Sequence, residues 1–370
     1  MRQPRLRFSA KPAVRLTESG TIVLVETEIK LALPRGLVDS LKTLPLITRY
    51  QHSGWQQVRL YNQYFDSAGL DLDKAGFALR MRRDGNQFIQ TLKGRGDSRA
   101  GLSVRQEWDW YPSSEQLDLP ALIDGAPAVI RETLAGKKLR PLFRNDFERR
   151  KVAILWNWRG SPVELELALD VGDVRTRHQR SPICELELEL RAGESQGLLA
   201  FAIELARQIP LCPLDVAKAE RGFRLLDPGR AANPPWTARP PGEVEPSIIT
   251  LLEMLVKRLV MAGEAAVLEL RTAADDPLEV ARLIERIIDE LPTPVLLRTV
   301  WQGLIIELQN LPGHDRTALK YWIEHHPTWG HAALNLRQWL DARSNDPQAT
   351  LSARHNSALL ALMEQITDEY

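Results

Sequence analysis

The chain has 370 residues, of which 44% are hydrophobic and 26% charged, and its 48 Lys and Arg residues balance its 48 Asp and Glu residues. This length favours two domains over a single core, and the composition is typical of a globular protein. Its two cysteines, Cys184 and Cys212, cannot form a disulfide framework or a cysteine metal site, and no stretch approaches the roughly 20 apolar residues that span a membrane.

The chain begins with a basic, polar arm. Residues 1–20 include Arg2, Arg5, Arg7, Lys11 and Arg15 but no apolar run of the kind that a signal peptide requires. We therefore expect residues 1–20 to be disordered, the protein to be cytoplasmic, and no membrane to be among its partners.

Residues 21–226 alternate apolar and polar side chains in many short runs, which predicts β-strands. Two stretches with helical spacing interrupt this pattern, near residues 36–46 and 195–208. The runs with strand periodicity are 22–31, 77–83, 88–93, 104–110, 147–155, 163–170 and 183–190.

The remaining chain differs in composition and in the spacing of its apolar residues. Residues 227–246 are rich in proline and predict a linker. In residues 247–370 the apolar spacing changes to a period of about 3.6, and prolines divide the region into about five or six predicted helices. Residues 1–244 carry 37 basic against 30 acidic side chains, whereas the rest carries 11 against 18. An anion-binding role is therefore expected in the first region, and packing or homodimer contact in the helical one.

The strands predicted in the first region each have one charged face. Because residues two apart in a strand share a face, Glu26, Glu28 and Lys30 lie together, opposite Val25 and Ile29. The same parity groups further charged residues on other strands. These are Arg80 with Arg82, Arg105 with Glu107 and Asp109, Glu164 with Glu166 and Asp170, and Glu185 with Glu187 and Glu189.

An ordinary antiparallel sheet with one solvated face explains any single strand of this kind. Across the set, however, like charges such as Glu185, Glu187 and Glu189 repel one another unless opposite charges lie nearby. A sheet closed with its charged side inward would bring such charges together in a polar barrel interior. Carboxylates bind Mg²⁺ through oxygen, and Arg and Lys bind phosphate, so the pattern favours a metal–polyphosphate ligand.

The segment Glu26-Thr27-Glu28-Ile29-Lys30 matches the ExExK signature of the CYTH, or triphosphate tunnel metalloenzyme, superfamily. Further segments resemble the family's other motifs in the same order, and together they cover residues 21–226. They are Tyr64-Phe65-Asp66, Gly76 to Arg82, Thr91-Leu92-Lys93-Gly94, Arg105-Gln106-Glu107, Asp146 to Arg149, Glu164 to Asp170, Cys184 to Leu190 and Lys218 to Phe223.

The resemblance implies an α+β fold, namely a closed eight-stranded antiparallel β-barrel with flanking helices, followed by an all-α module. It implies a tunnel domain at residues 21–226 and, after the linker, a degenerate or shortened CHAD-like module at 247–370, as in bacterial two-domain inorganic triphosphatases. The implied reaction is Mg²⁺- or Mn²⁺-dependent hydrolysis of inorganic triphosphate or another short polyphosphate.

Site residues follow from the resemblance and from strand parity. The expected catalytic residues are Glu26, Glu28 and Lys30. The expected substrate-binding residues are Lys30, Arg80, Arg82, Lys93, Arg105, Arg149, Lys151 and Lys218. The expected metal ligands are Glu26, Glu28, Glu166, Asp170, Glu185, Glu187 and Glu189, and Glu107 shares their inward parity.

Three alternatives remain beside this prediction. The same phosphate-binding residues would serve a thiamine triphosphatase or an adenylate cyclase-type enzyme, and a non-catalytic protein could bind polyphosphate without cleaving it. A pure anion binder is disfavoured because it would gain affinity by losing its carboxylates, whereas this chain retains Glu26, Glu28, Asp170, Glu185 and Glu187. Nucleic-acid binding is disfavoured because the basic residues point inward and the net charge is +0.

Overall fold

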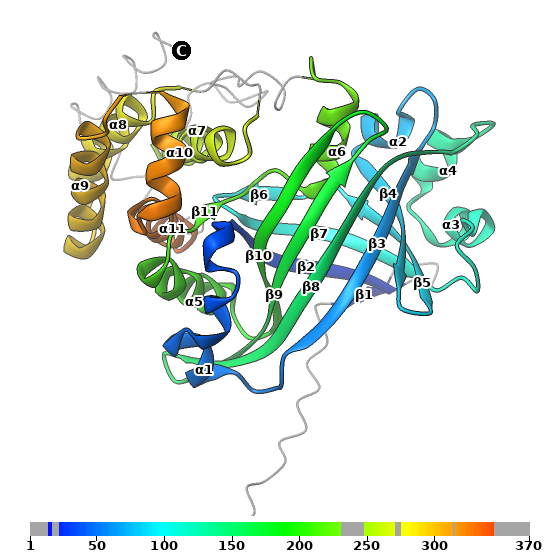
Figure 1. The fold of residues 1–370 in the computed structure, drawn as a ribbon, viewed down its shortest axis with the longest axis horizontal. Helices are drawn as coiled ribbons and strands as arrows, with labels where there is room; N and C mark the ends of the chain where they lie inside the picture. Colours follow the sequence, from blue (N-terminus) through cyan, green and yellow to red (C-terminus); the bar gives the residue numbers. More distant parts are fainter. Residues whose placement is uncertain (1–13, 17–21, 231–247, 271–274, 314, 344–370) are drawn as a thin grey trace, which may run out of the picture.

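A computed structural model describes residues 14–16, 22–230, 248–270, 275–313 and 315–343. Eight antiparallel strands form a closed barrel in the order β2-β10-β9-β8-β3-β4-β5-β7, and β7 pairs back onto β2 (Figure 1). This confirms the predicted barrel. The strands of the barrel are β2 (Ile22–Ala32), β3 (Gln56–Asp66), β4 (Phe77–Asp84), β5 (Gln87–Gly94), β7 (Leu102–Trp110), β8 (Arg140–Trp158), β9 (Ser161–Arg175) and β10 (Arg180–Ala192).

Three short strands extend the barrel at its edges. β1 (Val14–Leu16) and β11 (Cys212–Pro213) both pair with β2, and β6 (Asp97–Arg99) pairs with β7. β1 falls within the predicted basic arm, and the other residues of that arm lie outside the described part of the chain. Most of the predicted linker also lies outside it.

Helices cover the outer, apolar faces of the strands. α5 (Ser195–Gln208) and α1 (Pro45–Tyr50) lie on the wall formed by β2, β8, β9 and β10, where Leu165, Leu167, Leu186 and Leu188 are fully buried. On the opposite wall, α2 (Asp71–Lys74), α3 (Leu119–Gly125) and α4 (Ala128–Leu134) cover Leu79, Leu92 and Trp108. Because the apolar side chains of these strands are buried on the outside, the charged side chains at the alternate positions face the inside of the barrel.

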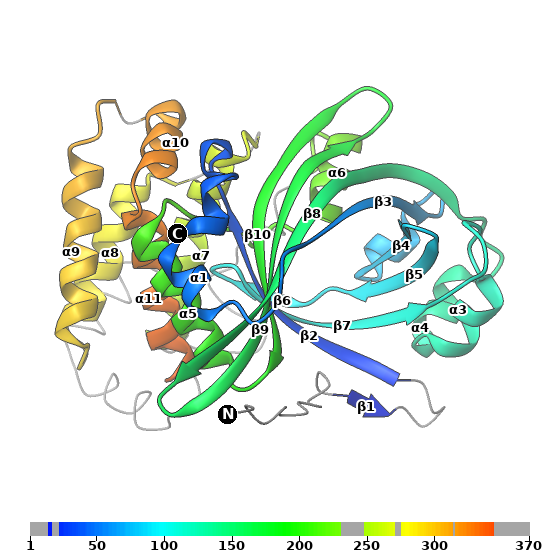
Figure 2. The same cartoon turned by 60° about the horizontal axis from the view of Figure 1, so that its bottom comes forward.

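One end of the barrel is closed by apolar side chains and by α6 (Lys218–Leu226). Tyr64 stacks on Phe143 with 4.7 Å between ring centroids, and Phe223 of α6 contacts Phe143 edge-on at 5.2 Å. A Cβ atom at Gly222 would lie 2.1 Å from the Phe143 ring, so glycine is what allows α6 to approach this closely. Figure 2 shows the barrel from a different side. α6 lies behind β8, and the helical region beyond the linker lies on the side of the barrel away from α3 and α4.

The region beyond the linker forms five helices within the described residues, in agreement with the predicted number. They are α7 (Ile248–Val267), α8 (Pro277–Asp289), α9 (Val295–Gln309), α10 (Arg316–His325) and α11 (Thr328–Asp341). They share one apolar cluster, which also includes Ala100 and Cys212 from the barrel side. The helices therefore pack directly on the outside of the barrel near β6, β11 and α5.

The helix predicted at residues 36–46 is wrong in its extent. The structure has two 3₁₀ turns, η1 (Arg35–Leu37) and η2 (Ser40–Thr43), and α1 begins only at Pro45. Proline fits the first turn of a helix because its missing N–H has no partner there, so Pro45 starts a new helix instead of continuing one. Within the part of the chain that the structure describes, every helix is too short or too polar to cross a membrane.

Candidate functional site

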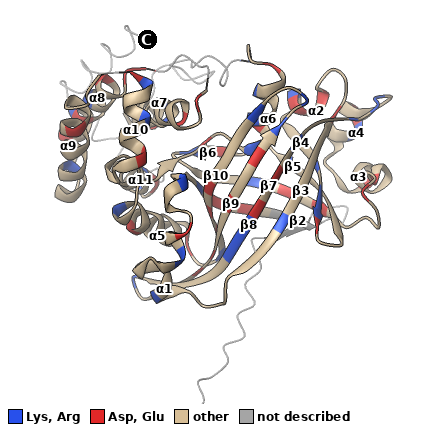
Figure 3. Cartoon of the chain, in the orientation of Figure 1, with Lys and Arg blue, Asp and Glu red and all other residues tan. Residues whose placement is uncertain are grey.

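The barrel register brings the predicted charged residues into one interior. Glu28 lies directly opposite Glu189, and Lys30 opposite Glu187, in the β2–β10 pair. Asp170 of β9 pairs with Glu185 on one side and with Arg149 on the other. Because cross-strand partners point to the same face, these side chains meet inside the tunnel, and Figure 3 shows acidic and basic residues side by side along these strands.

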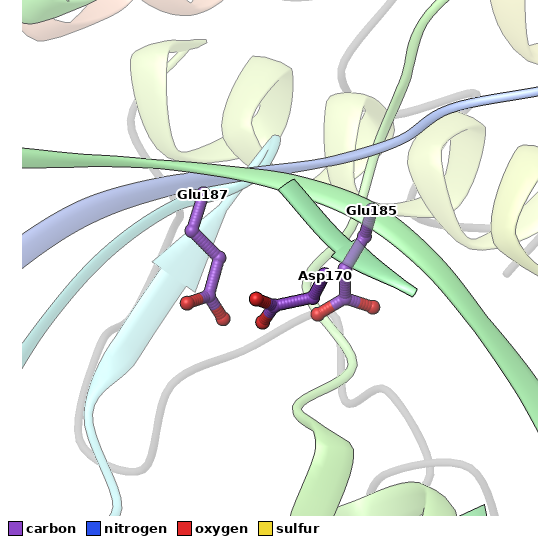
Figure 4. Close-up of side chains that lie close together, drawn as sticks. All are labelled: Asp170, Glu185 and Glu187. Atoms are coloured by element: carbon purple, nitrogen blue, oxygen red, sulfur yellow. The ribbon is translucent and has the colours of Figure 1, made fainter. Parts of the chain in front are cut away.

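The densest cluster of carboxylates lies next to α6. Asp170, Glu185 and Glu187 each place one carboxylate oxygen within 4.8 Å of the others, and Figure 4 shows the three carboxylates next to one another. The ammonium group of Lys218 lies among them, 2.8 Å from Asp170 Oδ2 and 2.8 Å from Glu187 Oε1, and it also donates to Glu185. Although burial disfavours its charge, these carboxylates raise the pKa of Lys218 above its usual value.

Two arginines complete this cluster. Arg149 donates two parallel hydrogen bonds of 2.7 Å to Asp170 and contacts Glu187 as well. Arg221, only 2% exposed, pairs with Glu185 at 3.1 Å. Burial opposes the ionisation of Glu187, but Lys218 and Arg149 outweigh it and hold the pKa of Glu187 well below its usual range.

A second charged cluster surrounds the ExExK strand. Arg105 bridges Glu26 at 2.8 Å and Glu28 at 2.7 Å, and Lys93 links Glu26 at 3.1 Å to Glu107 at 2.7 Å. Burial raises the pKa of Glu28, which is 2% exposed. Burial acts in the same direction on Glu26, but Lys93 and Arg105 override it and lower its pKa well below the usual value. The adjacent carboxylates of one motif therefore differ in how readily they hold a proton.

Three cations of the interior have weak pairing or none. Lys30 is 3% exposed, and its nearest carboxylate is Glu28 at 3.9 Å; Arg80 lies 3.8 Å from Glu107. Among the described residues, no carboxylate lies within ion-pair distance of Arg82, whose Nε donates to the Asn62 amide oxygen at 2.8 Å. Burial, together with repulsion from Arg80 and Arg149, lowers the pKa of Arg82 to about 10. Such cations favour an incoming anion, because it would supply the missing partner.

The remaining predicted residues form a third group farther along the tunnel. Lys151 pairs with Glu166 at 3.2 Å, and Arg191 pairs with Glu166 at 3.1 Å and with Glu189 at 2.6 Å. Burial raises the pKa of Glu189 to about 7, and the nearby Glu26 and Glu166 carboxylates add to this shift despite Arg191.

Among the residues that contact the predicted set and were missed by sequence reasoning are Asn62, Arg191 and Arg221. Arg191 continues the odd-numbered parity of Glu185, Glu187 and Glu189, so strand periodicity could have identified it. Arg221 is three residues after Lys218 and shares its helix face, which is also visible in sequence. Asn62 carries no charge, and only the β3–β4 register reveals that it lies opposite Arg82.

The carboxylate cluster at Asp170, Glu185 and Glu187 suits a hard divalent cation. Mg²⁺ prefers carboxylate oxygens, and the three side chains come from two neighbouring, fully paired strands that hold them in place. Lys218 shows that this position favours positive charge, since its ammonium group already forms ion pairs with all three carboxylates. A bound cation and the Lys218 ammonium would therefore compete for the same oxygens.

Comparison with known proteins identifies relatives of the barrel. The family model of the CYTH domain matches residues 24–223, from β2 through most of α6. The inorganic triphosphatase of Haemophilus influenzae is 29% identical over 205 residues, which are 55% of this chain and 56% of that protein. The match therefore spans about half the length of this curated relative.

The comparison with solved structures finds matches at low identity. An adenylyl cyclase candidate from Hippeastrum, reported to have a dominant triphosphatase activity, is 20% identical with a TM-score of 0.40 and covers 54% of this chain and 96% of its own. An adenylate cyclase candidate from Bacillus halodurans is 16% identical with a TM-score of 0.30 and covers 50% and 90%. Because the family model of the CYTH domain matches more than half of the residues of this chain, the chain belongs to the CYTH domain family.

Proposed function

We propose that this protein hydrolyses inorganic triphosphate to pyrophosphate and phosphate inside the barrel and requires Mg²⁺ or Mn²⁺. The observation that carries the proposal is the unequal pairing of charges in one enclosed space. Lys30, Arg80 and Arg82 lack close carboxylate partners, whereas Asp170, Glu185 and Glu187 converge as a cation site. A metal–triphosphate complex would satisfy both sets at once.

In this proposal the basic side chains bind and orient the phosphate chain. Arg82 offers a guanidinium fork to phosphate oxygens, and Lys30 and Arg80 add charge from the neighbouring strands. Lys93, Arg105, Arg149, Lys151 and Lys218 extend the same role once substrate draws them from their present carboxylate partners. Because the interior is buried, each such contact is stronger than it would be in water.

The carboxylates are proposed to hold the cation and to orient the attacking water. Asp170, Glu185 and Glu187 would hold it, with Glu26, Glu28, Glu166 and Glu189 as further candidate ligands. When bound, the metal supplies Lewis-acid stabilisation of phosphate charge. Glu28 and Glu26, beside Lys30, are the proposed residues that position water for in-line attack on the terminal phosphorus, where the P–O bond to the pyrophosphate leaving group breaks.

The test is phosphate release from inorganic triphosphate, ATP and thiamine triphosphate in parallel, each with Mg²⁺, Mn²⁺ or EDTA. We expect fast cleavage of inorganic triphosphate, dependent on the metal, and slower cleavage of the other two. Preference for thiamine triphosphate, or release of pyrophosphate with a cyclic nucleotide from ATP, would assign the barrel to the other predicted activities. Tight triphosphate binding without cleavage would make the protein a polyphosphate binder.

We propose two further properties of the helical region. It is related to CHAD modules, and it forms a homodimer contact. α9 exposes Val295, Leu296 and Ile306 on its outer face, with Val295 80% accessible. Sedimentation equilibrium of the whole chain, compared with Leu296→Glu, measures whether this face holds two copies together.

A further inference from the structure

The connection between the barrel and α6 is fixed on the barrel side by residues 214–216. The backbone N–H of Leu214 donates to the carbonyl of Lys30 at 2.9 Å. The Asp215 carboxylate accepts hydrogen bonds from the backbone N–H of Gly101 at 2.9 Å and from the hydroxyl of Ser98 at 2.8 Å. This short segment therefore joins β2 to the turn between β6 and β7 immediately before α6 begins.

A carboxyl group from the helical region holds the same segment from the other side. Glu264 of α7 is 2% exposed, and its Oε1 accepts hydrogen bonds from two consecutive backbone N–H groups, those of Asp215 and Val216, the latter at 2.7 Å. α6 has no side-chain cap of its own, since its N-cap residue is Ala217. Burial raises the pKa of Glu264 to about 8, and the neighbouring Asp215 carboxylate acts in the same direction. A buried carboxyl is costly, so its two backbone partners are what keep it in place.

The segment leads directly to Lys218, the first residue of α6. Only Ala217 separates Val216, whose N–H Glu264 binds, from Lys218, whose ammonium reaches Asp170, Glu185 and Glu187. Arg230, which follows α6, also ties the helix to the barrel, because it forms two hydrogen bonds with Asp73 of α2, of 2.7 and 2.9 Å, and pairs with Glu220 in the first turn of α6. The path of residues 214–217 therefore contributes, together with the contacts of α6 itself, to how far Lys218 enters the tunnel.

We propose that Glu264 is a positioning residue for Lys218, so that the C-terminal helical region completes the tunnel site from outside the barrel. This inference rests on the proposed function, since it assigns to the helical region a part in the triphosphatase reaction. Among the described residues, Glu264 forms no hydrogen bond or ion pair with a side chain of the tunnel interior, although its charge interacts with that of Arg221. Its direct contacts are with the backbone before α6.

The experiment compares three variants of the full chain. Glu264→Ala removes the acceptor and leaves two buried N–H groups unpaired. Glu264→Gln keeps a side-chain carbonyl at the same position. Ile284→Ala removes a fully buried side chain of α8 in the same helical core and controls for loss of stability alone.

Turnover of inorganic triphosphate should separate these variants. We expect Glu264→Ala to lower kcat/KM about tenfold, and Glu264→Gln and Ile284→Ala to stay within about threefold of the parent chain. In a Lys218→Ala background, Glu264→Ala should change kcat/KM less than about twofold, because the group through which it acts is gone. An equal loss in both backgrounds, or an equal loss in Ile284→Ala, overturns the inference.

Hydrogen exchange provides a measure that does not depend on turnover. Amides of residues 216–226 should exchange about tenfold faster in Glu264→Ala than in the parent chain or Glu264→Gln, while those of β9 and β10 stay unchanged. If the parent chain fails to cleave triphosphate, the proposed function is wrong, and this comparison still decides whether Glu264 holds α6. Unchanged exchange in α6 would refute the positioning role whatever the turnover.

Discussion

Lys218 of α6 and Asp170 of β9 meet at the closed end of the tunnel, with 2.8 Å between the ammonium nitrogen and Oδ2 of the carboxylate. Asp170 is fully buried and is also bound by both nitrogens of the Arg149 fork. The carboxylate cluster is therefore neutralised by the chain's own cations, and any cation that enters must replace at least one of them.

Lys218→Met tests this competition directly. Without the ammonium, we expect Mn²⁺ alone to bind about tenfold more tightly, because the carboxylates lose their competing partner. Triphosphate turnover should nevertheless fall, since a phosphate-binding cation is lost. Calorimetric titration with Mn²⁺ measures the first effect, and Lys137→Met, which removes a half-exposed lysine outside the tunnel, is the control. Weaker Mn²⁺ binding in Lys218→Met would contradict the competition.

Glu28→Gln tests the ExExK strand. The change removes one buried carboxylate charge at nearly constant volume, so the fold should persist while metal-dependent kcat falls at least about a hundredfold. Glu148→Gln is the matched control, because Glu148 lies on β8 with the opposite parity and pairs with Arg150 outside the tunnel. Steady-state kinetics at several Mg²⁺ concentrations, with thermal unfolding as a check on folding, provide the comparison. Full activity in Glu28→Gln would remove this residue from the site.

Arg82→Gln tests the unpaired guanidinium. Among the described residues, the Asn62 amide is the one hydrogen-bond partner of the Arg82 guanidinium, so its loss should raise the Kd for triphosphate about tenfold to a hundredfold. Stability should change little, because removal of a buried charge without a carboxylate partner offsets the hydrogen bond lost to Asn62. The neighbouring residue offers a control on the same strand. Arg83 points outward and stacks over Tyr61 at 4.5 Å, so Arg83→Gln should bind triphosphate as the parent chain does. Binding is measured in EDTA, where no turnover occurs, and equal affinities for the two variants would argue against an anion site at Arg82.

The pKa of Glu189 predicts a pH dependence of stability. Because the folded-state pKa is raised to about 7 from a usual value of 4.5, the folded protein binds this proton more tightly than the unfolded chain does. This contribution stabilises the fold below pH ~4.5 and is lost as pH rises through about 7. Glu189→Gln mimics the protonated form, so its Tm in EDTA should match that of the parent chain near pH ~5 and exceed it near pH ~8. A Tm difference that does not change with pH would show that Glu189 ionises normally.

The charged interior could be predicted from the sequence, because the alternation of charged and apolar residues along each strand shows which side chains face inward. Alternating charged and leucine residues over 163–170 and 183–190 correspond to β9 and β10, whose leucines are buried under α5. β3 is missing from the strands predicted by periodicity, because its inward side chains include Leu60, Asn62 and Tyr64 and show no charge alternation. Periodicity cannot identify a strand whose two faces are equally mixed.

The parts that depend on distant contacts could not be predicted. Lys218 entered the expected site by family resemblance alone, and its insertion among three carboxylates depends on the docking of α6 over the end of the barrel. Likewise, nothing in the pattern of α7 distinguishes Glu264 from a surface glutamate. Its burial arises only because the helical region packs against the segment before α6, a contact between residues that lie far apart in sequence.

The closure of the barrel at β2 has a consequence for how this family can diverge. β2 pairs with β10 along one edge and with β7 along the other, while Ile29 and Leu31 lie fully buried on its outer face. A single inserted residue would turn Glu26, Glu28 and Lys30 into that apolar layer and break both pairings. A one-residue insertion between these positions is therefore more disruptive than the replacement of one of their side chains. Over long divergence, the spacing of these positions should be more durable than the residues that occupy them.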